Sequence, residues 1–136
     1  MSTQIPGLFI MHSETKGRGV FTANSIQKGD LVESTPVIVL TKEDREVLHE
    51  TSLHDYYFLW GQAQKACAIA LGYGSLYNHS RASNLEFTLV YGEDCIEFHA
   101  SRDIEPGEEL LINYASAEHK DYGIWFEEDS NAEKKR

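Results

Sequence analysis

The segment GEELLINY, residues 107–114, places a turn directly before a short strand and ends that strand on a tyrosine. Pro106 and Gly107 form a Pro-Gly pair, which is a strong turn signal. The apolar run that follows predicts a strand over Leu110–Tyr114. A strand-terminal tyrosine alone is typical of packing in a core or at its rim. The segment therefore decides the fold only together with two segments upstream.

The nearer of these is GYGSLYNHS, residues 72–80, which Asn84 follows closely. It concentrates small, amide and imidazole side chains in an otherwise apolar region, which is unusual for a core strand. Asn78 and His79 supply donors and acceptors that can hold an adenine edge or an amino-acid head group. A buried Asn–His pair that serves only its own turn fits the same residues equally well.

The third segment is KGRGVF, residues 16–21. Gly17 and Gly19 allow the backbone to approach a ligand closely or to adopt a positive φ between strands. A plain turn over Gly17-Arg18-Gly19 is the simpler interpretation. The segment is neither a phosphate loop, since no GxxxxGK[ST] occurs, nor a GxGxxG fingerprint, because Phe21 and Thr22 follow Gly19. A nucleotide-like ligand would need a different cradle.

The rest of the chain predicts a small, mainly β domain. Strands are expected at Leu8–Met11, Val20–Ala23, Leu31–Leu40, His54–Trp60, Ala66–Leu71, Leu85–Tyr91, Cys95–Ala100 and Leu110–Tyr114. Thr41 followed by Asp44 resembles an N-cap with an acidic first turn, which predicts a helix over Thr41–Glu50. No internal repeat or linker divides the pattern, so one domain is expected.

Composition narrows the class of protein. A chain of 136 residues with 41% hydrophobic content can bury a core of its own. Its net charge of -10 argues against non-specific binding to phosphate backbones and favours a basic polypeptide as partner, although most acidic proteins are merely soluble. Cys67 and Cys95 have no CxxC partner, which indicates reduced thiols and no zinc. Neither a membrane span nor a signal peptide is expected.

Metal-dependent and serine hydrolysis find little support. The chain contains six histidines, namely His12, His49, His54, His79, His99 and His119. Their spacing matches neither HExxH nor another zinc motif. No GxSxG elbow is present for a serine nucleophile. We therefore expect no metal site.

GRGVF, YNHS with a following Asn, and GEELLINY occur in an order and spacing that resemble the SET-domain family of protein-lysine methyltransferases. The resemblance runs from about Leu8 to Tyr114. It implies a β-clip fold of several small twisted sheets with few short helices, in which the final strand region threads the Asn78-His79 segment in a pseudoknot. It also implies one SET domain over residues 1–126, followed by a polar and mobile tail over 127–136, without the cysteine-rich segments that flank many members.

The resemblance implies S-adenosylmethionine as cofactor, S-adenosylhomocysteine as product, and no metal. The residues that would hold the cofactor are Lys16, Gly17, Arg18, Gly19, Tyr77, Asn78, His79, Tyr114 and Trp125. Gly17 to Gly19 would meet it largely through the backbone. Asn78 and His79 would hold its methionine and adenine portions.

The same resemblance assigns Tyr114 as the active-site tyrosine and Tyr56 as a second catalytic residue beside the acceptor lysine. The substrate channel would be lined by Tyr56, Phe87, Tyr114 and Phe126. We expect Tyr114 to orient the lysine amine rather than to remove its proton. Phe87 stands where the family carries Phe or Tyr. Because Phe87 has no hydroxyl to hold a water, we expect room for dimethylation or trimethylation.

The implied partner is a basic protein or peptide, such as a histone, that contains the target lysine. No direct binding to nucleic acid or membrane is expected. We expect an intracellular location, which is the cytoplasm, or the host nucleus if the protein is viral or a secreted effector. A homodimer is expected only by analogy with short viral and bacterial members. One alternative is a SET-like module that binds without turnover. Another is an interaction domain in which the tyrosines are core; Asn78, His79 and Tyr114 favour the enzyme.

Overall fold

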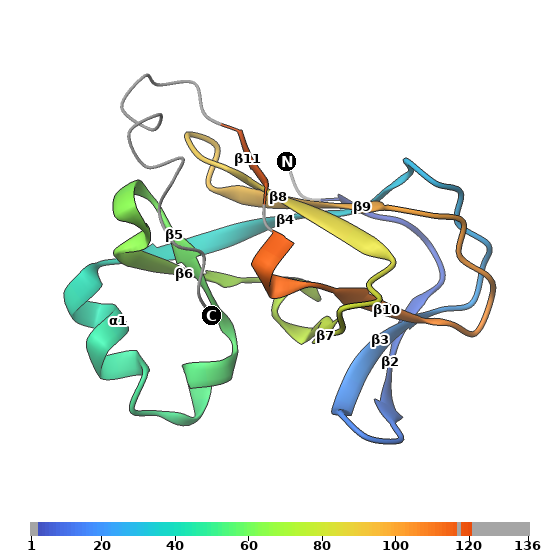
Figure 1. Cartoon of the computed structure of the whole chain (residues 1–136), viewed down its shortest axis with the longest axis horizontal. Coiled ribbons are helices and arrows are strands. Elements are labelled where there is room, and N and C mark those ends of the chain that lie inside the picture. The colour runs from blue at the N-terminus through green and yellow to red at the C-terminus, as the bar shows by residue number, and fades with distance from the viewer. Residues whose placement is uncertain (1–2, 117, 121–136) are drawn as a thin grey trace.

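The computed structural model describes residues 3–116 and 118–120, and its framework is a pair of twisted β-sheets (Figure 1). The strands are β1 (Thr3–Gln4), β2 (Leu8–Ser13), β3 (Gly17–Thr22), β4 (Leu31–Leu40), β5 (Tyr57–Trp60), β6 (Ala66–Ala70), β7 (Asn78–His79), β8 (Leu85–Val90), β9 (Cys95–Ala100), β10 (Glu109–Ile112) and β11 (Glu118–Lys120). The helices are α1 (Lys42–Leu48) and the short 3-10 segments η1 (Ser52–Asp55), η2 (Gln62–Gln64), η3 (Gly74–Leu76) and η4 (Tyr114–Ser116).

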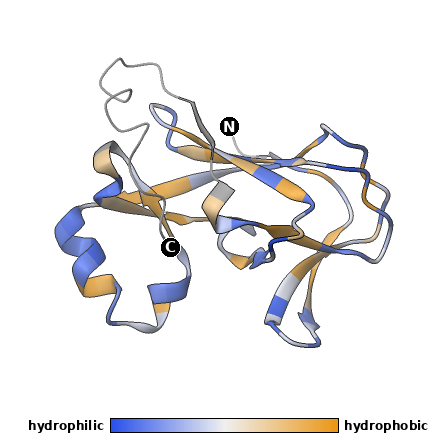
Figure 2. Cartoon of the chain, viewed as in Figure 1, coloured by the Kyte–Doolittle hydropathy of each residue, from blue (hydrophilic) through white to orange (hydrophobic). Residues whose placement is uncertain are grey.

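The larger sheet has the order β11-β8-β9-β4-β6-β5, and β1 pairs with β4. The antiparallel hairpin of β8 and β9 lies beside β4, and within it Phe87 lies opposite Phe98. Both side chains are buried, and each apolar side chain of this size contributes about 1.5–3 kcal/mol when it is fully buried. Figure 2 shows apolar residues along these strands and mostly hydrophilic residues on α1. The larger sheet therefore supplies much of the hydrophobic core, which also includes Val20 of β3 and Leu110 and Ile112 of β10.

The smaller sheet has the order β2-β3-β10-β7 and joins segments that lie far apart in the sequence. β10 pairs antiparallel with β3, with Leu110 opposite Val20, and parallel with β7, with Leu111 opposite Asn78. A parallel pair cannot be made by a hairpin and needs a crossover connection. The predicted pseudoknot involves the same two segments of the chain. The mainly β fold of small sheets with a short helix is confirmed.

The predicted turn at Gly17-Arg18-Gly19 is wrong, because these residues already belong to β3. Ser13 is the residue opposite Gly17, so the hairpin turns through residues 14–16. The Ser13 hydroxyl holds this turn by accepting the Lys16 backbone N–H at 2.9 Å. Gly17 is the first residue of β3 and has a φ of 73°, a conformation that residues with a Cβ rarely adopt.

Two other predicted boundaries are corrected. The strand expected over His54–Trp60 begins only at Tyr57, because the Thr51 side chain accepts the Leu53 N–H at 3.1 Å and caps η1. Tyr114 lies in η4, beyond the end of β10 at Ile112. The predicted helix is confirmed as α1, with a capping box between Thr41 and Asp44. None of the helices in the described residues is long and apolar enough to cross a membrane.

Candidate active site

The parallel pairing of β7 with β10 fixes the position of the Asn78 side chain. Asn78 Nδ2 donates to Glu109 Oε2 at 2.7 Å and to the Arg18 carbonyl at 3.0 Å. Both amide hydrogens are therefore directed into the protein. The Asn78 side-chain oxygen is the part of this amide that can accept a hydrogen bond from a ligand.

Gly19 lies directly beneath this pair of side chains. A Cβ at position 19 would collide with the Glu109 carboxylate and would lie 2.8 Å from Asn78 Nδ2. The close approach that we predicted for this glycine is therefore made to two side chains of the protein. At Gly17, by contrast, a Cβ would meet nothing within 4 Å.

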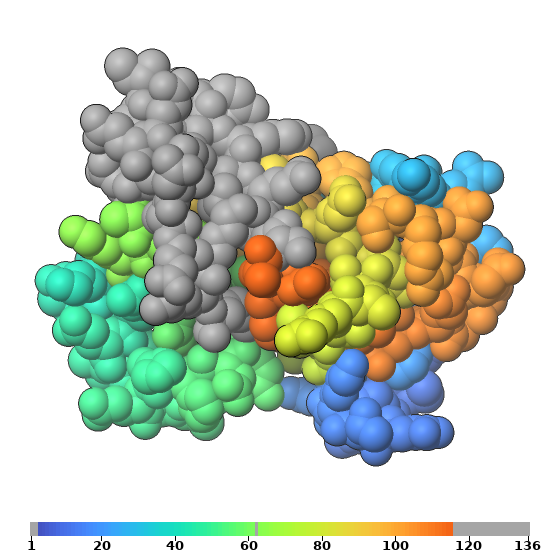
Figure 3. Space-filling view, in the orientation of Figure 1, coloured from blue at the N-terminus to red at the C-terminus, as the bar shows by residue number. Residues whose placement is uncertain are grey.

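His79 and Tyr114 form a stacked pair, with ring centroids 5.0 Å apart and an interplanar angle of 26°. The Tyr114 backbone N–H donates to His79 Nδ1 at 3.2 Å, so in the neutral ring the hydrogen is carried by Nε2. Lys16 Nζ donates to the His79 carbonyl at 3.0 Å. The exposed imidazole therefore presents a donor next to the Lys16 ammonium. In Figure 3 the red-orange surface of η4 adjoins the yellow surface of the segment that follows β7.

Tyr114 also borders a cavity of about 230 Å³, which is lined by His54, Asp55, Tyr57 and Tyr114. Its hydroxyl donates to the Tyr77 carbonyl at 3.3 Å. Tyr57 is 9% exposed, whereas the Asp55 side chain is 76% exposed, so the cavity has an aromatic interior and a carboxylate at its outer part. One tyrosine thus contacts the Asn78-His79 segment and lines a separate cavity.

A short wall of the cavity comes from η1. His54 Nδ1 lies 2.8 Å from the Thr51 carbonyl, and His54 Nε2 lies 3.3 Å from Asp55 Oδ2. Both ring nitrogens therefore face acceptors, which orients the imidazole. Sequence reasoning missed His54, Asp55 and Tyr57 as site residues. The only available signal was the aromatic run that we assigned to a strand.

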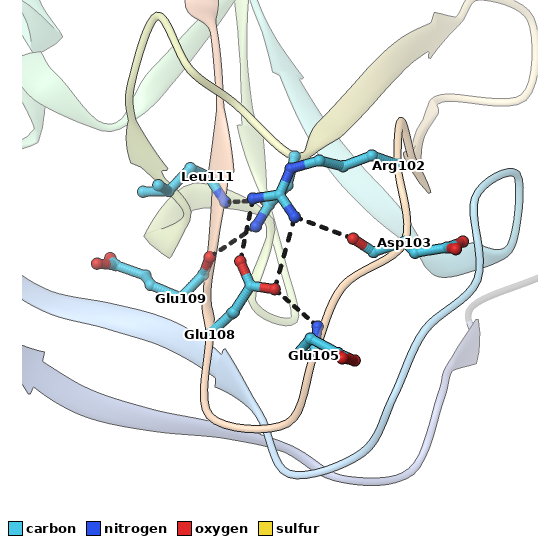
Figure 4. A network of polar contacts seen from close by, with 7 residues as sticks. Arg102, Asp103, Glu105, Glu108, Glu109 and Leu111 are labelled. Atoms are coloured by element: carbon cyan, nitrogen blue, oxygen red, sulfur yellow. Dashed lines mark hydrogen bonds and ion pairs between the residues drawn. The ribbon is translucent and has the colours of Figure 1, made fainter.

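A polar network holds the turn that leads into β10 (Figure 4). Arg102 Nη2 lies 3.0 Å from Glu108 Oε1, and Glu108 Oε2 accepts the Glu105 N–H at 2.7 Å. The Arg102 hydrogen bond, aided by the Glu105 N–H, lowers the pKa of Glu108. Asn84 then fixes the strand itself, since it donates to the Glu109 carbonyl at 2.9 Å and accepts the Leu111 N–H at 2.8 Å.

Three predicted site residues lie elsewhere. Tyr56 is 39% exposed and is not part of the cavity lining, where its neighbour Tyr57 stands. Phe87 lies in the core, with its ring 5.4 Å from that of Phe58. The Tyr77 hydroxyl donates to Glu33 Oε1 at 2.6 Å, away from the site, and burial together with Glu33 raises its pKa well above the ordinary value.

Trp125, Phe126 and the expected tail over residues 127–136 lie outside the described residues. Their predicted roles stay predictions. Within residues 3–116 and 118–120, no group of three or more His, Cys, Asp or Glu side chains is placed to hold a metal ion.

Comparison with protein families gives a match to the SET domain over residues 17–115, which includes Asn78, His79 and Tyr114. The chain belongs to the SET-domain family. A histone-lysine N-methyltransferase of Schizosaccharomyces pombe, H3 lysine-37 specific, is 32% identical over 126 residues, which are 92% of this chain and 80% of that protein. The N-lysine methyltransferase KMT5A-A of Danio rerio is 33% identical over 121 residues, and the match covers 79% of this chain and 35% of that protein.

Solved structures share the fold of this chain. A Plasmodium falciparum protein described as a histone methyltransferase superposes with a TM-score of 0.60 at 27% identity, covering 87% of this chain and 94% of that one. A chain of the ctPRC2 complex gives a TM-score of 0.66 at 22% identity, covering 85% of this chain and 16% of its own, and shows the fold alone. The chain is a SET-domain protein-lysine methyltransferase, and methyltransferases of this family use S-adenosylmethionine.

Proposed function

We propose that this protein transfers methyl groups from S-adenosylmethionine to the side-chain amine of a lysine in a basic protein, such as a histone. The observation that carries the proposal is the double contact of Tyr114. Its ring stacks on His79, next to the Lys16 and Asn78 groups, and it also lines the cavity formed with η1 and β5. A residue with this position can orient two reactants that arrive from different directions.

The groups around His79 fit the cofactor. An amino-acid head group carries a carboxylate and an ammonium, while an adenine edge offers both acceptors and a donor. The Lys16 ammonium and the His79 Nε2–H supply donors, and the Asn78 amide oxygen supplies an acceptor. The backbone at Gly17 has open space beside it. We assign Lys16, Gly17, Asn78 and His79 to the cofactor. Arg18 supports them through its carbonyl, which accepts from Asn78 Nδ2, and Gly19 through its close packing against Asn78.

The cavity beside Tyr114 fits a lysine side chain. The exposed carboxylate of Asp55 attracts the incoming ammonium, and the rings of Tyr57 and Tyr114 enclose its aliphatic stem. Removal from water disfavours the charged amine and lowers its pKa. The amine that reaches Tyr114 is therefore neutral and can act as a nucleophile.

The cofactor supplies a methyl group on a positively charged sulfur, which is reactive enough to need no covalent enzyme intermediate. The contribution of this chain is therefore position. Holding two reactants in line replaces a two-body encounter with an intramolecular one, which accounts for roughly 7–11 kcal/mol of a barrier. Tyr114 fixes the amine, and its own orientation is fixed by the Tyr77 carbonyl and the His79 ring.

The net charge of -10 supports a basic substrate. The name of the Schizosaccharomyces pombe relative gives histone H3 as the substrate of that protein, and we extend the histone class to the present chain. We also propose an intracellular site of action. A homodimer, and the roles of Tyr56, Tyr77, Trp125 and Phe126 in binding, stay predictions.

The test is incubation with labelled S-adenosylmethionine and a panel of basic proteins that includes histones, followed by mass spectrometry of the labelled protein. We expect label on a lysine. Tyr114→Phe should lower turnover by about 100-fold or more, a size typical of lost transition-state positioning, while cofactor affinity stays within about twofold. Tyr73→Phe is the matched control, because its ring is partly buried outside the site.

Wild-type protein that binds the cofactor but labels no member of the panel would favour the binding module without turnover. Absence of cofactor binding in calorimetry would favour the interaction domain. Full activity of folded Tyr114→Phe would remove the role assigned to that hydroxyl.

A further inference from the structure

The wall of the cavity that faces Tyr114 has few packing contacts of its own. Residues 51–56 are all exposed, and α1, which precedes them, contains no buried residue. Segments with little buried apolar surface open at low free energy. The shape of the cavity therefore depends on the polar contacts that tie this segment to the rest of the protein.

His49 supplies such a contact, because it joins the two ends of the segment over residues 50–56. It is the C-cap of α1, and its backbone N–H donates to the Arg45 carbonyl at 2.9 Å. Its side chain reaches across the segment to the first residue of β5, with His49 Nδ1 2.9 Å from the Tyr57 hydroxyl. Arg45 Nη1 donates to the Gln64 carbonyl at 2.8 Å and anchors the same end of the helix.

The same imidazole contacts two of the four residues that line the cavity. Its ring lies edge-on to Tyr57, with centroids 6.0 Å apart, and edge-on to His54, with centroids 5.9 Å apart. A nearly buried tyrosine hydroxyl needs a hydrogen-bond partner to keep its ring in one orientation. His49 therefore fixes both the Tyr57 ring and the η1 wall.

We propose that His49 is a positioning residue for the lysine pocket: it closes the segment over residues 50–56 and sets the Tyr57 side chain opposite Tyr114. This inference rests on the proposed function, because it assigns the cavity to the acceptor lysine. His49 is not part of the cavity lining and acts through Tyr57.

The experiment compares His49→Ala, His49→Asn, Tyr57→Phe and the double variant His49→Ala/Tyr57→Phe in the full chain. One hydrogen bond is worth about 1 kcal/mol, so His49→Ala should lower kcat/KM for the protein substrate about fivefold to tenfold. Cofactor affinity by calorimetry should stay within about twofold, since His49 lies away from the His79 side. His49→Asn should restore most of the activity, because an amide at the Nδ1 position can donate or accept. The double variant should be no worse than the more impaired single variant.

His99→Asn, on β9, is the matched control and should behave as the wild type. All assays are run well below the melting temperature measured for each variant, so that unfolding does not enter the rates. The inference is overturned if wild-type protein methylates lysine and His49→Ala does so equally well, or if Asn fails to restore activity although the variant is folded. Wild-type protein without any methyl transfer would instead overturn the proposed function.

Discussion

Asn78 Nδ2 and Glu109 Oε2 lie 2.7 Å apart although 31 residues separate them in the sequence. The contact joins β7 to β10 beside their two ladder positions and directs the Asn78 oxygen away from the protein. Glu109 lies in the GEELLINY segment but is not among the predicted cofactor residues, and it supports them through this contact. Through this one hydrogen bond, the pairing of β7 with β10 also fixes the orientation of a predicted cofactor residue.

Glu109→Ala should therefore weaken cofactor binding. Without the carboxylate, one amide hydrogen of Asn78 loses its partner and the side chain can rotate. A hydrogen bond to a charged group contributes about 1.5–3 kcal/mol, and partial exposure of Glu109 reduces this, so we expect about a fivefold to 20-fold higher Kd for S-adenosylmethionine. Calorimetry measures it. Glu86→Gln, on the exposed face of β8, is the control, and an unchanged Kd in Glu109→Ala would contradict the assigned role.

Two glycines of one motif should respond differently to alanine. Gly19→Ala places a methyl group against Glu109 and Asn78, so we expect both a lower melting temperature and weak cofactor binding. Gly17→Ala meets no atoms and costs only the strain of a positive φ, about 1–2 kcal/mol. Thermal unfolding and calorimetry on both variants give the comparison. Equal loss of cofactor affinity in the two would show that the close contact at Gly19 is not what matters.

The acid response of the turn before β10 can be worked out from Glu108. Its pKa in the folded protein is lowered from 4.5, chiefly by the Arg102 hydrogen bond. A lowered folded pKa adds stability above the ordinary pKa, and this stability is lost as the pH falls through the folded value. Glu108→Gln should therefore destabilise the protein at pH 7, and it should do so less at pH 3, which lies below the ordinary pKa of 4.5. Because the Glu108 side chain is 32% exposed, we expect an effect of at most about 1 kcal/mol. Denaturant unfolding at both pH values decides; a difference that is the same at both would contradict the assignment.

The sequence predicts the elements whose patterns are local. β4 and β9 have the predicted ends, because their apolar residues are bounded by clear turn signals. η1 was missed because an aromatic run resembles a strand, while the deciding interaction is the Thr51 cap. The parallel β7–β10 pairing left no local signal, and the family resemblance implied only that the Asn78-His79 segment and the final strand region meet. The cavity joins η1 to Tyr114, some 60 residues onward, so residue spacing could not place it.

Phe87 is the residue that we expect to influence how many methyl groups the substrate lysine receives. Phe87 is 2% exposed, its ring packs against Phe58 and Phe98, and its side chain carries no hydroxyl that could hold a water. We expect wild-type protein to form dimethyl-lysine and trimethyl-lysine. Phe87 does not line the cavity, but its ring packs on Phe58, the neighbour of the cavity residue Tyr57, so the hydroxyl that Phe87→Tyr adds must find a partner close to the pocket. The added group should restrict space and shift the product toward monomethyl-lysine.

Mass spectrometry of one substrate lysine at several reaction times measures this shift. Phe98→Tyr is the control, because it adds the same hydroxyl to the facing strand. If wild-type protein forms only monomethyl-lysine and Phe87→Tyr leaves the product unchanged, Phe87 has no part in product specificity and belongs to the core alone. A shift in both variants would show that any polar group in this core alters the pocket, whereas a shift in Phe87→Tyr alone places the control of methylation at that side chain.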